Sequence, residues 1–90
     1  MNKADLLDTS AYIRISSYRT KVCDSLFGEE VYKTPTQIAQ DAGIKTNHIS
    51  KVLKDLKNID IVECINPERR KGRLYHLTNK GHELSRFMNE

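Results

Sequence analysis

The sequence is poor in cysteine and contains no long apolar run. Its two cysteines, Cys23 and Cys64, are too few and too far apart for a disulfide framework or a zinc knuckle. No C-x-C, C-x-x-C or H-x-x-x-H spacing gathers metal ligands, so we expect no metal and no cofactor. No run of about 18 apolar residues occurs, and the first fifteen residues show no export signal. These absences predict a cytoplasmic protein with free thiols and no membrane association.

Catalytic motifs are also missing. The 90 residues contain no paired carboxylates, no nucleophile–base spacing and no phosphate-cradling glycine loop. A chain of this size buries roughly 64% of its unfolded surface on folding. That is enough for one modest core, but not for a core together with a deep catalytic cleft. We therefore expect a single domain over residues 1–90, with its core at about 17–84, and no enzyme activity.

Charge is distributed unevenly along the chain. The formal net charge is +3, from 15 basic and 12 acidic residues. Residues 1–45 carry six basic and six acidic side chains, whereas residues 46–90 carry nine basic and six acidic ones. The basic excess therefore lies entirely in the second half, as expected of a face that binds a polyanion.

Two helices are predicted in the first third of the chain. Residues 3–8 indicate a short helical turn, and residues 12–15 favour either an extended segment or the approach to the next helix. Ser17 is a candidate N-cap for a helix that stops at Gly28. Val22 and Leu26 share one face of this helix, with Tyr18 one turn earlier and Cys23 and Phe27 alongside, and we expect this stripe to be a core face.

Stronger signals predict a helix-turn-helix. In Thr34-Pro35-Thr36-Gln37, a threonine cap, a proline at the first helical position and a capping-box glutamine start a short helix that ends at Gly43. The next helix begins at about Thr46. Its apolar residues follow the i, i+3, i+4, i+7 template: Ile49, Val52, Leu53 and Leu56. The residues between them are polar and mostly basic.

After residue 58 the pattern becomes strand-like. Residues 61–65 and 73–77 read as two strands, and residues 66–72 combine turn residues with clustered charge. Thr78 is a candidate cap for a last helix. The segment therefore predicts a hairpin with a long basic tip.

Two helices joined by a glycine turn, the second polar and basic on one face, are typical of a DNA-binding helix-turn-helix. The short amide of Asn47 suits adenine edges, and Lys51 suits guanine acceptors or a phosphate. The candidate DNA-binding residues are Thr36, Gln37, Thr46, Asn47, His48, Ser50, Lys51, Lys54, Arg69, Arg70, Lys71 and Arg73.

The segments T-P-T-Q-I-A, H-I-S-K-V-L-K-D-L and R-L-Y-H-L-T-N-K-G-H-E-L occur in the order helix, helix, hairpin exit. In this order they resemble a winged helix-turn-helix domain, similar to MarR/ArsR-type transcriptional regulators and especially to compact winged-helix regulators common in archaea. The resemblance covers about Ser17 to Leu84. It implies an α+β fold, a recognition helix at about 46–58 and a wing at about 66–72. The chain lacks the extended helices that many members use for ligand pockets, so it indicates no small-molecule ligand.

Sequence-specific binding of double-stranded DNA in transcription regulation is thus the leading hypothesis. The alternative is a winged-helix protein-interaction module that binds no bases, because the same fold also serves in such assemblies. Two interpretations are also open for the hydrophobic residues near the two ends of the chain, Leu6, Leu7, Phe87 and Met88. They either pack on their own core or pair with a second copy in a homodimer.

Overall fold

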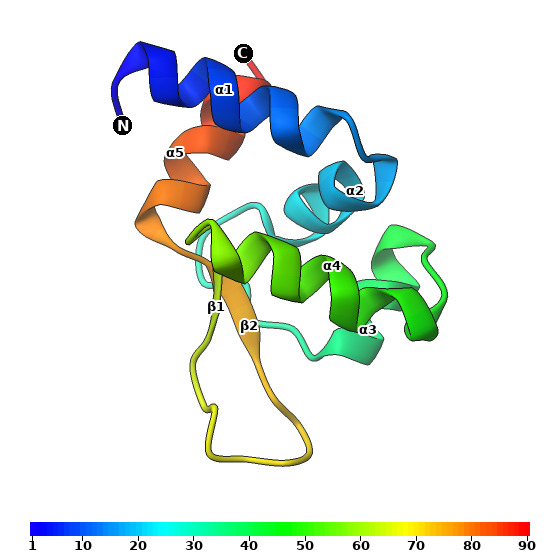
Figure 1. The fold of residues 1–90 in the computed structure, drawn as a ribbon. Coiled ribbons are helices and arrows are strands. Elements are labelled where there is room, and N and C mark those ends of the chain that lie inside the picture. The colour runs from blue at the N-terminus through cyan, green and yellow to red at the C-terminus, as the bar shows by residue number, and fades with distance from the viewer.

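The computed structural model describes residues 1–90 as five helices and one two-stranded antiparallel hairpin. The elements are α1 (Lys3–Arg14), α2 (Ser17–Leu26), α3 (Pro35–Ala42), α4 (Thr46–Asn58), β1 (Val62–Cys64), β2 (Tyr75–Leu77) and α5 (Asn79–Met88). Figure 1 shows α1 and α5 in contact at one end of the molecule and the hairpin loop projecting from the other. This is the α+β arrangement predicted for a winged helix-turn-helix. None of the five helices combines the length and apolar character that a membrane crossing requires.

One hydrophobic core joins the helices to the hairpin. All four residues of the predicted α4 stripe are buried in it, together with Val22, Cys23 and Leu26 of α2. Tyr18 and Phe27, which were predicted for the same core face, are exposed instead. Ile13 of α1 is fully buried as well, so the core begins before residue 17. Cys23 lies in this core, where burial and the neighbouring Asp24 raise the pKa of its thiol to about 12. Its role is therefore packing.

The helix-turn-helix forms as its sequence signals predict. The Thr34 hydroxyl accepts a hydrogen bond from the Gln37 amide at 3.2 Å, and the Gln37 side chain accepts one from the Thr34 amide at 2.9 Å. Pro35 is the first residue of α3. Gly43 ends the helix at φ 69°, a left-handed conformation that favours glycine. Buried Ile44 then anchors the turn before α4.

The hairpin strands are shorter than the predicted 61–65 and 73–77. Their ladder covers three pairs, Val62–Leu77, Glu63–His76 and Cys64–Tyr75. It stops there because the side chain of Asn66, instead of a backbone carbonyl, accepts the Leu74 amide at 2.8 Å. Tyr75 also exchanges both backbone hydrogen bonds with Lys33, at 2.8 and 3.1 Å. This bridge was not predicted, because a single paired residue has no periodicity.

The N-terminal predictions were partly wrong. α1 is longer than the turn expected at residues 3–8 and includes residues 12–14, which were expected to be extended or to lead into the next helix. Ser16, not Ser17, caps α2, since its hydroxyl accepts the Arg19 amide at 3.2 Å. The burial of Ile13 explains the longer helix, because tertiary packing outweighs the strand propensity of β-branched residues.

Candidate nucleic-acid interface

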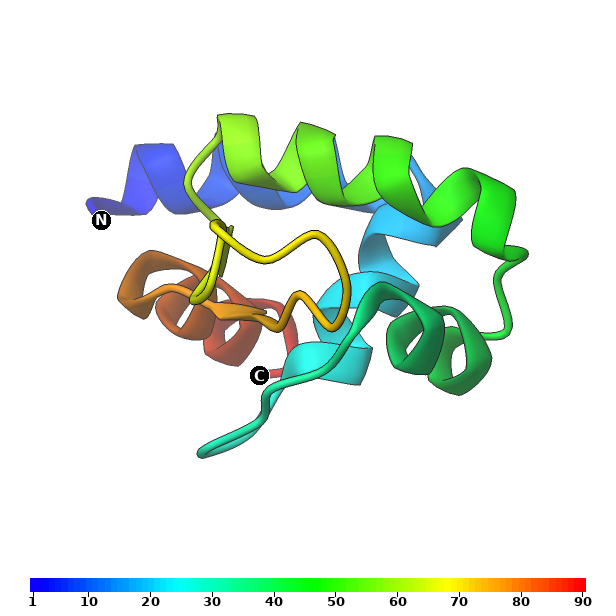
Figure 2. The ribbon, with the colours of Figure 1, turned by 90° about the horizontal axis from the view of Figure 1, so that it is seen from below.

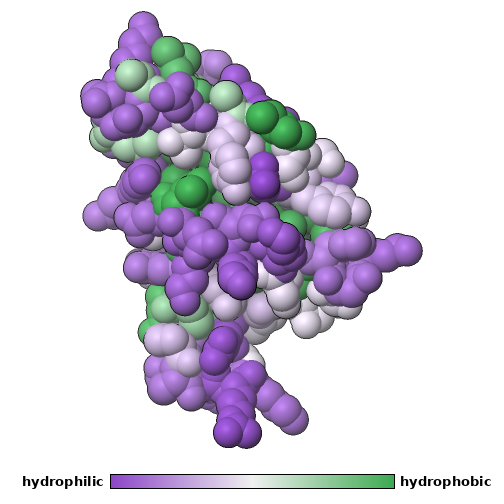
Figure 3. Space-filling model, in the orientation of Figure 1, coloured by the Kyte–Doolittle hydropathy of each residue, from purple (hydrophilic) through white to green (hydrophobic).

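α4 presents a polar face to solvent, opposite its buried stripe. Thr46, Asn47, Ser50, Lys51 and Lys54 are all exposed on it. Asn47 and Lys51 are four residues apart and therefore lie one helical turn apart on the same face. Figure 3 shows hydrophilic side chains over α4 and over the projecting hairpin loop. Short amides and flexible cations on one helical face are the groups that read base edges and reach phosphates.

A groove of about 260 Å³ separates α4 from the root of the wing. We call it the helix–wing groove, and its lining residues are Pro35, Ser50, Leu53, Lys54, Lys57, Arg73 and Tyr75. Three of these are cations and none is acidic. Neither lysine forms an ion pair with another residue of the chain. Figure 1 shows the hairpin loop projecting below α4, and Figure 2 looks at the same hairpin from below. Unpaired cations around one open groove repel each other, and a bound anion would relieve that repulsion.

Lys51 is held by an acidic neighbour. Its ammonium nitrogen lies 2.8 Å from the Asp55 carboxylate, which is also 3.8 Å from the Arg19 guanidinium. The hydrogen bond from Lys51 is the main cause that lowers the pKa of Asp55 below its usual range. Arg19 stacks on the Tyr12 ring at 3.9 Å and donates to the Tyr12 carbonyl at 2.9 Å. A chain of polar contacts thus joins α1 and α2 to the exposed face of α4.

His48 is the predicted site residue that has an aromatic partner. It lies in the first turn of α4 against Tyr18 of α2, with the ring centroids 5.4 Å apart and the planes tilted by 40°. Both residues are exposed. The contact extends the polar face of α4 onto α2.

The two predicted residues on α3 are placed differently. Thr36 is exposed in the first turn, whereas the side-chain carbonyl of Gln37 is occupied by the capping box. Only the amide nitrogen of Gln37 is therefore left for an external ligand.

The predicted cations of the wing fall into two kinds. Arg70 and Lys71 are exposed, and their side chains have no partner within the chain. Arg69 and Arg73 instead donate to backbone carbonyls of the wing itself. The structure therefore separates side chains that are free to contact a ligand from side chains that are already occupied.

Four residues that line the helix–wing groove are absent from the predicted site: Pro35, Leu53, Lys57 and Tyr75. Lys57 lies three residues after Lys54, so helical periodicity alone places it on the same side of α4. That signal was available in the sequence. Tyr75 lines the groove because β2 pairs with both β1 and Lys33, and no local pattern indicates this pairing.

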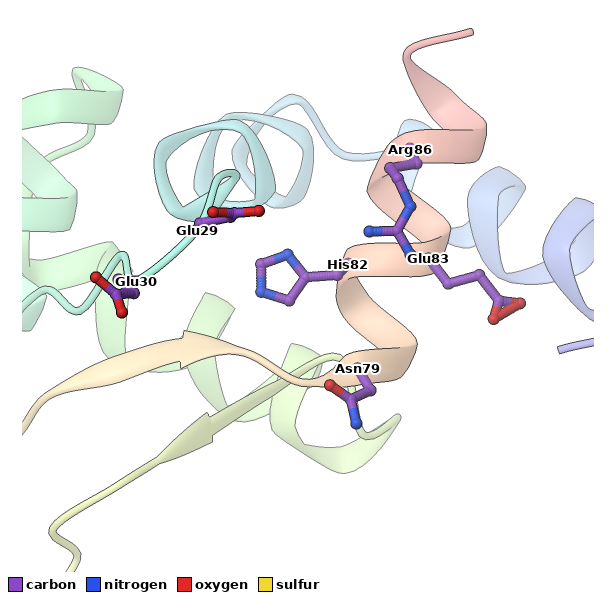
Figure 4. A pocket seen from close by; sticks show the side chains of 6 residues that line it. All are labelled: Glu29, Glu30, Asn79, His82, Glu83 and Arg86. Carbon is purple, nitrogen blue, oxygen red and sulfur yellow. The ribbon is translucent and has the colours of Figure 1, made fainter.

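Larger hollows lie elsewhere, and their charge is of the wrong sign for DNA. One of about 560 Å³ lies between α5 and the segment after α2, with the lining Glu29, Glu30, Asn79, His82, Glu83 and Arg86. Figure 4 shows His82 directed toward the glutamates of that segment. Glutamates outnumber cations there, so this hollow repels a polyanion. The helix–wing groove is smaller, but it is the one whose charge fits.

Comparisons with known proteins give structural matches only. No protein-family model matches the chain, and no curated protein matches it. The solved structures that it resembles include a MarR family transcriptional regulator from Silicibacter pomeroyi, at 19% identity and a TM-score of 0.67, covering 96% of this chain. NadR in complex with 4-hydroxyphenylacetate follows at 18% identity and a TM-score of 0.71, covering 97%. The structure of NMB1585, a MarR family regulator from Neisseria meningitidis, aligns at 21% identity and a TM-score of 0.69, covering 99%.

The matched structures are longer than this chain. It spans 58% of the Silicibacter regulator, 64% of NadR and 71% of the Neisseria regulator. The alignment nevertheless includes nearly every residue of the chain, from α1 through the helix-turn-helix and hairpin to α5. The predicted resemblance is thereby confirmed in its fold: the chain folds as a winged helix-turn-helix of the kind seen in MarR family regulators.

Proposed function

We propose that residues 1–90 act as one DNA-binding domain of a transcription regulator that recognises a specific double-stranded sequence. The observation that carries this proposal is the helix–wing groove. Lys54 and Lys57 face it without a single acidic side chain in its lining. A duplex backbone is the polyanion that a groove between a helix and a hairpin can follow over several phosphates.

In this proposal each element has a separate task. α4 enters the major groove, where Asn47 and Lys51 face base edges. The helix–wing groove takes the phosphates next to the helix, with Ser50 as an additional hydroxyl donor. Arg70 and Lys71 extend this contact to the neighbouring backbone or the minor groove. In this proposal the domain has no catalytic activity. It acts in the cytoplasm, where it reaches its DNA.

The test is the salt dependence of duplex binding. A domain that neutralises about four to six phosphates should show log K falling against log[salt] with a slope of roughly −4 to −5. A dimer should double this slope. Fluorescence anisotropy of a labelled duplex over a salt series measures it, and a slope near zero on every duplex would rule out DNA binding.

The alternative is a protein-interaction module. The exposed apolar side chains of Tyr32 and Ile65 favour it, because a DNA duplex offers few apolar groups that could cover them. In that case Tyr32→Ser should abolish partner binding and leave duplex binding unchanged. Partner binding and duplex binding of Tyr32→Ser, measured side by side, distinguish a protein-interaction module from a DNA-binding domain.

We also propose that the protein binds DNA as a homodimer through α1. The exposed side of this helix carries an apolar stripe of Ala4, Leu7, Ala11 and Ile15, spaced at three and four residues. Leu6, Phe87 and Met88 are instead packed against the protein's own core. The available dimer surface is thus α1 itself, and two copies would place two recognition helices on a palindromic site.

A further inference from the structure

The wing closes on itself through the side chain of Asn66. The carboxamide oxygen accepts the Leu74 amide at 2.8 Å and the Cys64 thiol at 3.4 Å, and the carboxamide nitrogen donates to the Gly72 carbonyl at 3.1 Å. One side chain at the start of the loop therefore binds backbone groups at its end. This holds the two sides of the wing at a fixed separation.

Arg73 braces the same loop from the other side. Its guanidinium donates through Nε to the Arg69 carbonyl at 2.6 Å and through Nη2 to the Pro67 carbonyl at 3.1 Å. Two bonds from one rigid, planar guanidinium fix the relative position of both acceptors, whereas a lysine ammonium on its flexible stem has no such fixed geometry. The tip between these anchors is thereby held in one conformation.

Arg70 and Lys71 lie in the loop between Asn66 and Arg73, and their side chains take part in none of these hydrogen bonds. Their side chains are exposed and have no partner within the chain. A rigid support next to two free cations is the arrangement expected of a preorganised contact, because a loop already in its bound shape loses less conformational entropy on binding.

We propose that Asn66 and Arg73 are positioning residues, which hold the wing in its binding conformation so that Arg70 and Lys71 contact the nucleic acid. This inference rests on the proposed DNA binding. It also divides three cations of the wing, Arg70, Lys71 and Arg73, into two roles that the sequence does not distinguish. Arg73 acts through the geometry of its guanidinium, and Arg70 acts through its charge.

Substitutions that keep the charge separate the two roles. Arg73→Lys loses the two-carbonyl brace, so duplex affinity should fall about three- to tenfold through the cost of ordering the loop. The salt slope should stay unchanged, because the number of cations is the same. The matched control Arg70→Lys keeps its phosphate contact and should change affinity by no more than about twofold. Equal losses for the two variants would overturn the proposal.

A double-mutant cycle tests whether Arg73 acts through its neighbours. In an Arg70→Ala, Lys71→Ala background the two free cations of the wing are gone, so the brace has neither of them left to position. Arg73→Lys should then cost nothing further in affinity, although it costs about three- to tenfold in the wild-type background. The same loss in both backgrounds would mean that Arg73 contacts DNA directly, which contradicts a positioning role.

The brace also has a readout that needs no DNA. Amide hydrogen exchange at Leu74 should accelerate in Arg73→Lys while the free energy of unfolding stays the same, because only the loop opens. Arg70→Lys should leave this exchange rate unchanged. Unchanged exchange at Leu74 in Arg73→Lys would overturn the brace. Accelerated exchange in a protein that binds no duplex would confirm the brace and overturn the proposed function instead.

Discussion

Asn47 and Arg70 differ in what their side chains can reach, so their substitutions should have different effects. Asn47 carries a short amide on the exposed face of α4, which needs a base partner at a fixed position. Asn47→Ala should cost about 1–3 kcal/mol on the cognate duplex and much less on a scrambled one. Arg70→Ala should weaken binding to both duplexes by similar factors and reduce the salt slope by about one.

Competition binding with cognate and scrambled duplexes measures this difference. Ser50→Ala is a useful comparison on the same helix, since its hydroxyl faces the helix–wing groove and should affect both duplexes alike. If Asn47→Ala weakens the two duplexes equally, α4 does not read bases at that position.

Asp55 is the acidic residue that holds Lys51, and its removal should strengthen binding. Its lowered pKa keeps the carboxylate charged at neutral pH, and the pair with Lys51 is lost only when the pH falls through that lowered value. A phosphate must therefore compete with Asp55 for Lys51. Asp55→Asn should raise affinity for a scrambled duplex about three- to tenfold and steepen the salt slope by about one.

Asp41→Asn is the matched control for Asp55→Asn. It removes the same charge from an aspartate that also pairs with a lysine, but that partner is Lys33, 2.9 Å away and outside α4. The hydrogen bond from Lys33 lowers the pKa of Asp41 in the same direction. Fluorescence anisotropy titrations of Asp55→Asn and Asp41→Asn over a salt series distinguish these two explanations. Equal gains would indicate a general charge effect instead of competition for Lys51.

A contact between two side chains can be predicted from the sequence only where both residues belong to the same helix or strand. The spacing of Lys51 and Asp55 is four residues on a helix, so their ion pair follows from periodicity. The contact of Asp55 with Arg19 joins two helices and depends on how they pack. The brace of Arg73 depends on a loop conformation that no local rule specifies.

The same division holds for whole elements. α3 and α4 were predicted with the right ends, because a capping box, a left-handed glycine and an apolar stripe all act locally. α1 was predicted too short, because its length depends on the burial of Ile13 against other helices. The bridge between Lys33 and Tyr75 was missed for the same reason. Local signals predict an element, whereas tertiary contacts decide how far it extends.

α5 docks on the hairpin through Gly81, and this contact leaves no room for a larger residue. A β-carbon at position 81 would collide with the backbone carbonyl of Ile61. Alanine usually stabilises a helix relative to glycine. Gly81→Ala should nevertheless lower the free energy of unfolding by about 1–3 kcal/mol, because α5 must move away from the backbone of Ile61. Urea denaturation measures the change.

Asn79→Ala provides the comparison within the same turn of α5. Asn79 is exposed, so its replacement should change the free energy of unfolding by less than about 0.5 kcal/mol. A Gly81→Ala variant as stable as the wild type would mean that the packing of α5 on the hairpin is looser than the structure describes.

On the scale of the whole molecule, the proposed DNA contacts and the proposed dimer surface belong to separate elements. The former lie on α4 and the wing, and the latter lies on α1 (Figure 1). The contacts from Tyr12 through Arg19 and Asp55 to Lys51 connect the two. A change in the packing of α1 can therefore reach Lys51, one of the side chains proposed to face DNA.

The dimer can be tested by placing a charge on the exposed stripe of α1. Ile15 is 83% exposed, an unusual position for a large apolar side chain that has no partner. Sedimentation equilibrium should give twice the chain mass of 10.4 kDa for the wild type. Ile15→Glu should give the single mass, because a charge buried in a small apolar interface stays desolvated and unpaired.

Ile65→Glu is the matched control, since Ile65 is also an exposed isoleucine, at 47%, but follows β1 at the base of the wing. It should leave the mass unchanged. The dimer also determines the salt dependence, because two domains neutralise about twice as many phosphates as one. Ile15→Glu should therefore halve the salt slope on a palindromic duplex while a half-site binds as before. A wild-type protein that sediments as a monomer both free and on its duplex would contradict the dimer, and the single domain would then carry all of the recognition.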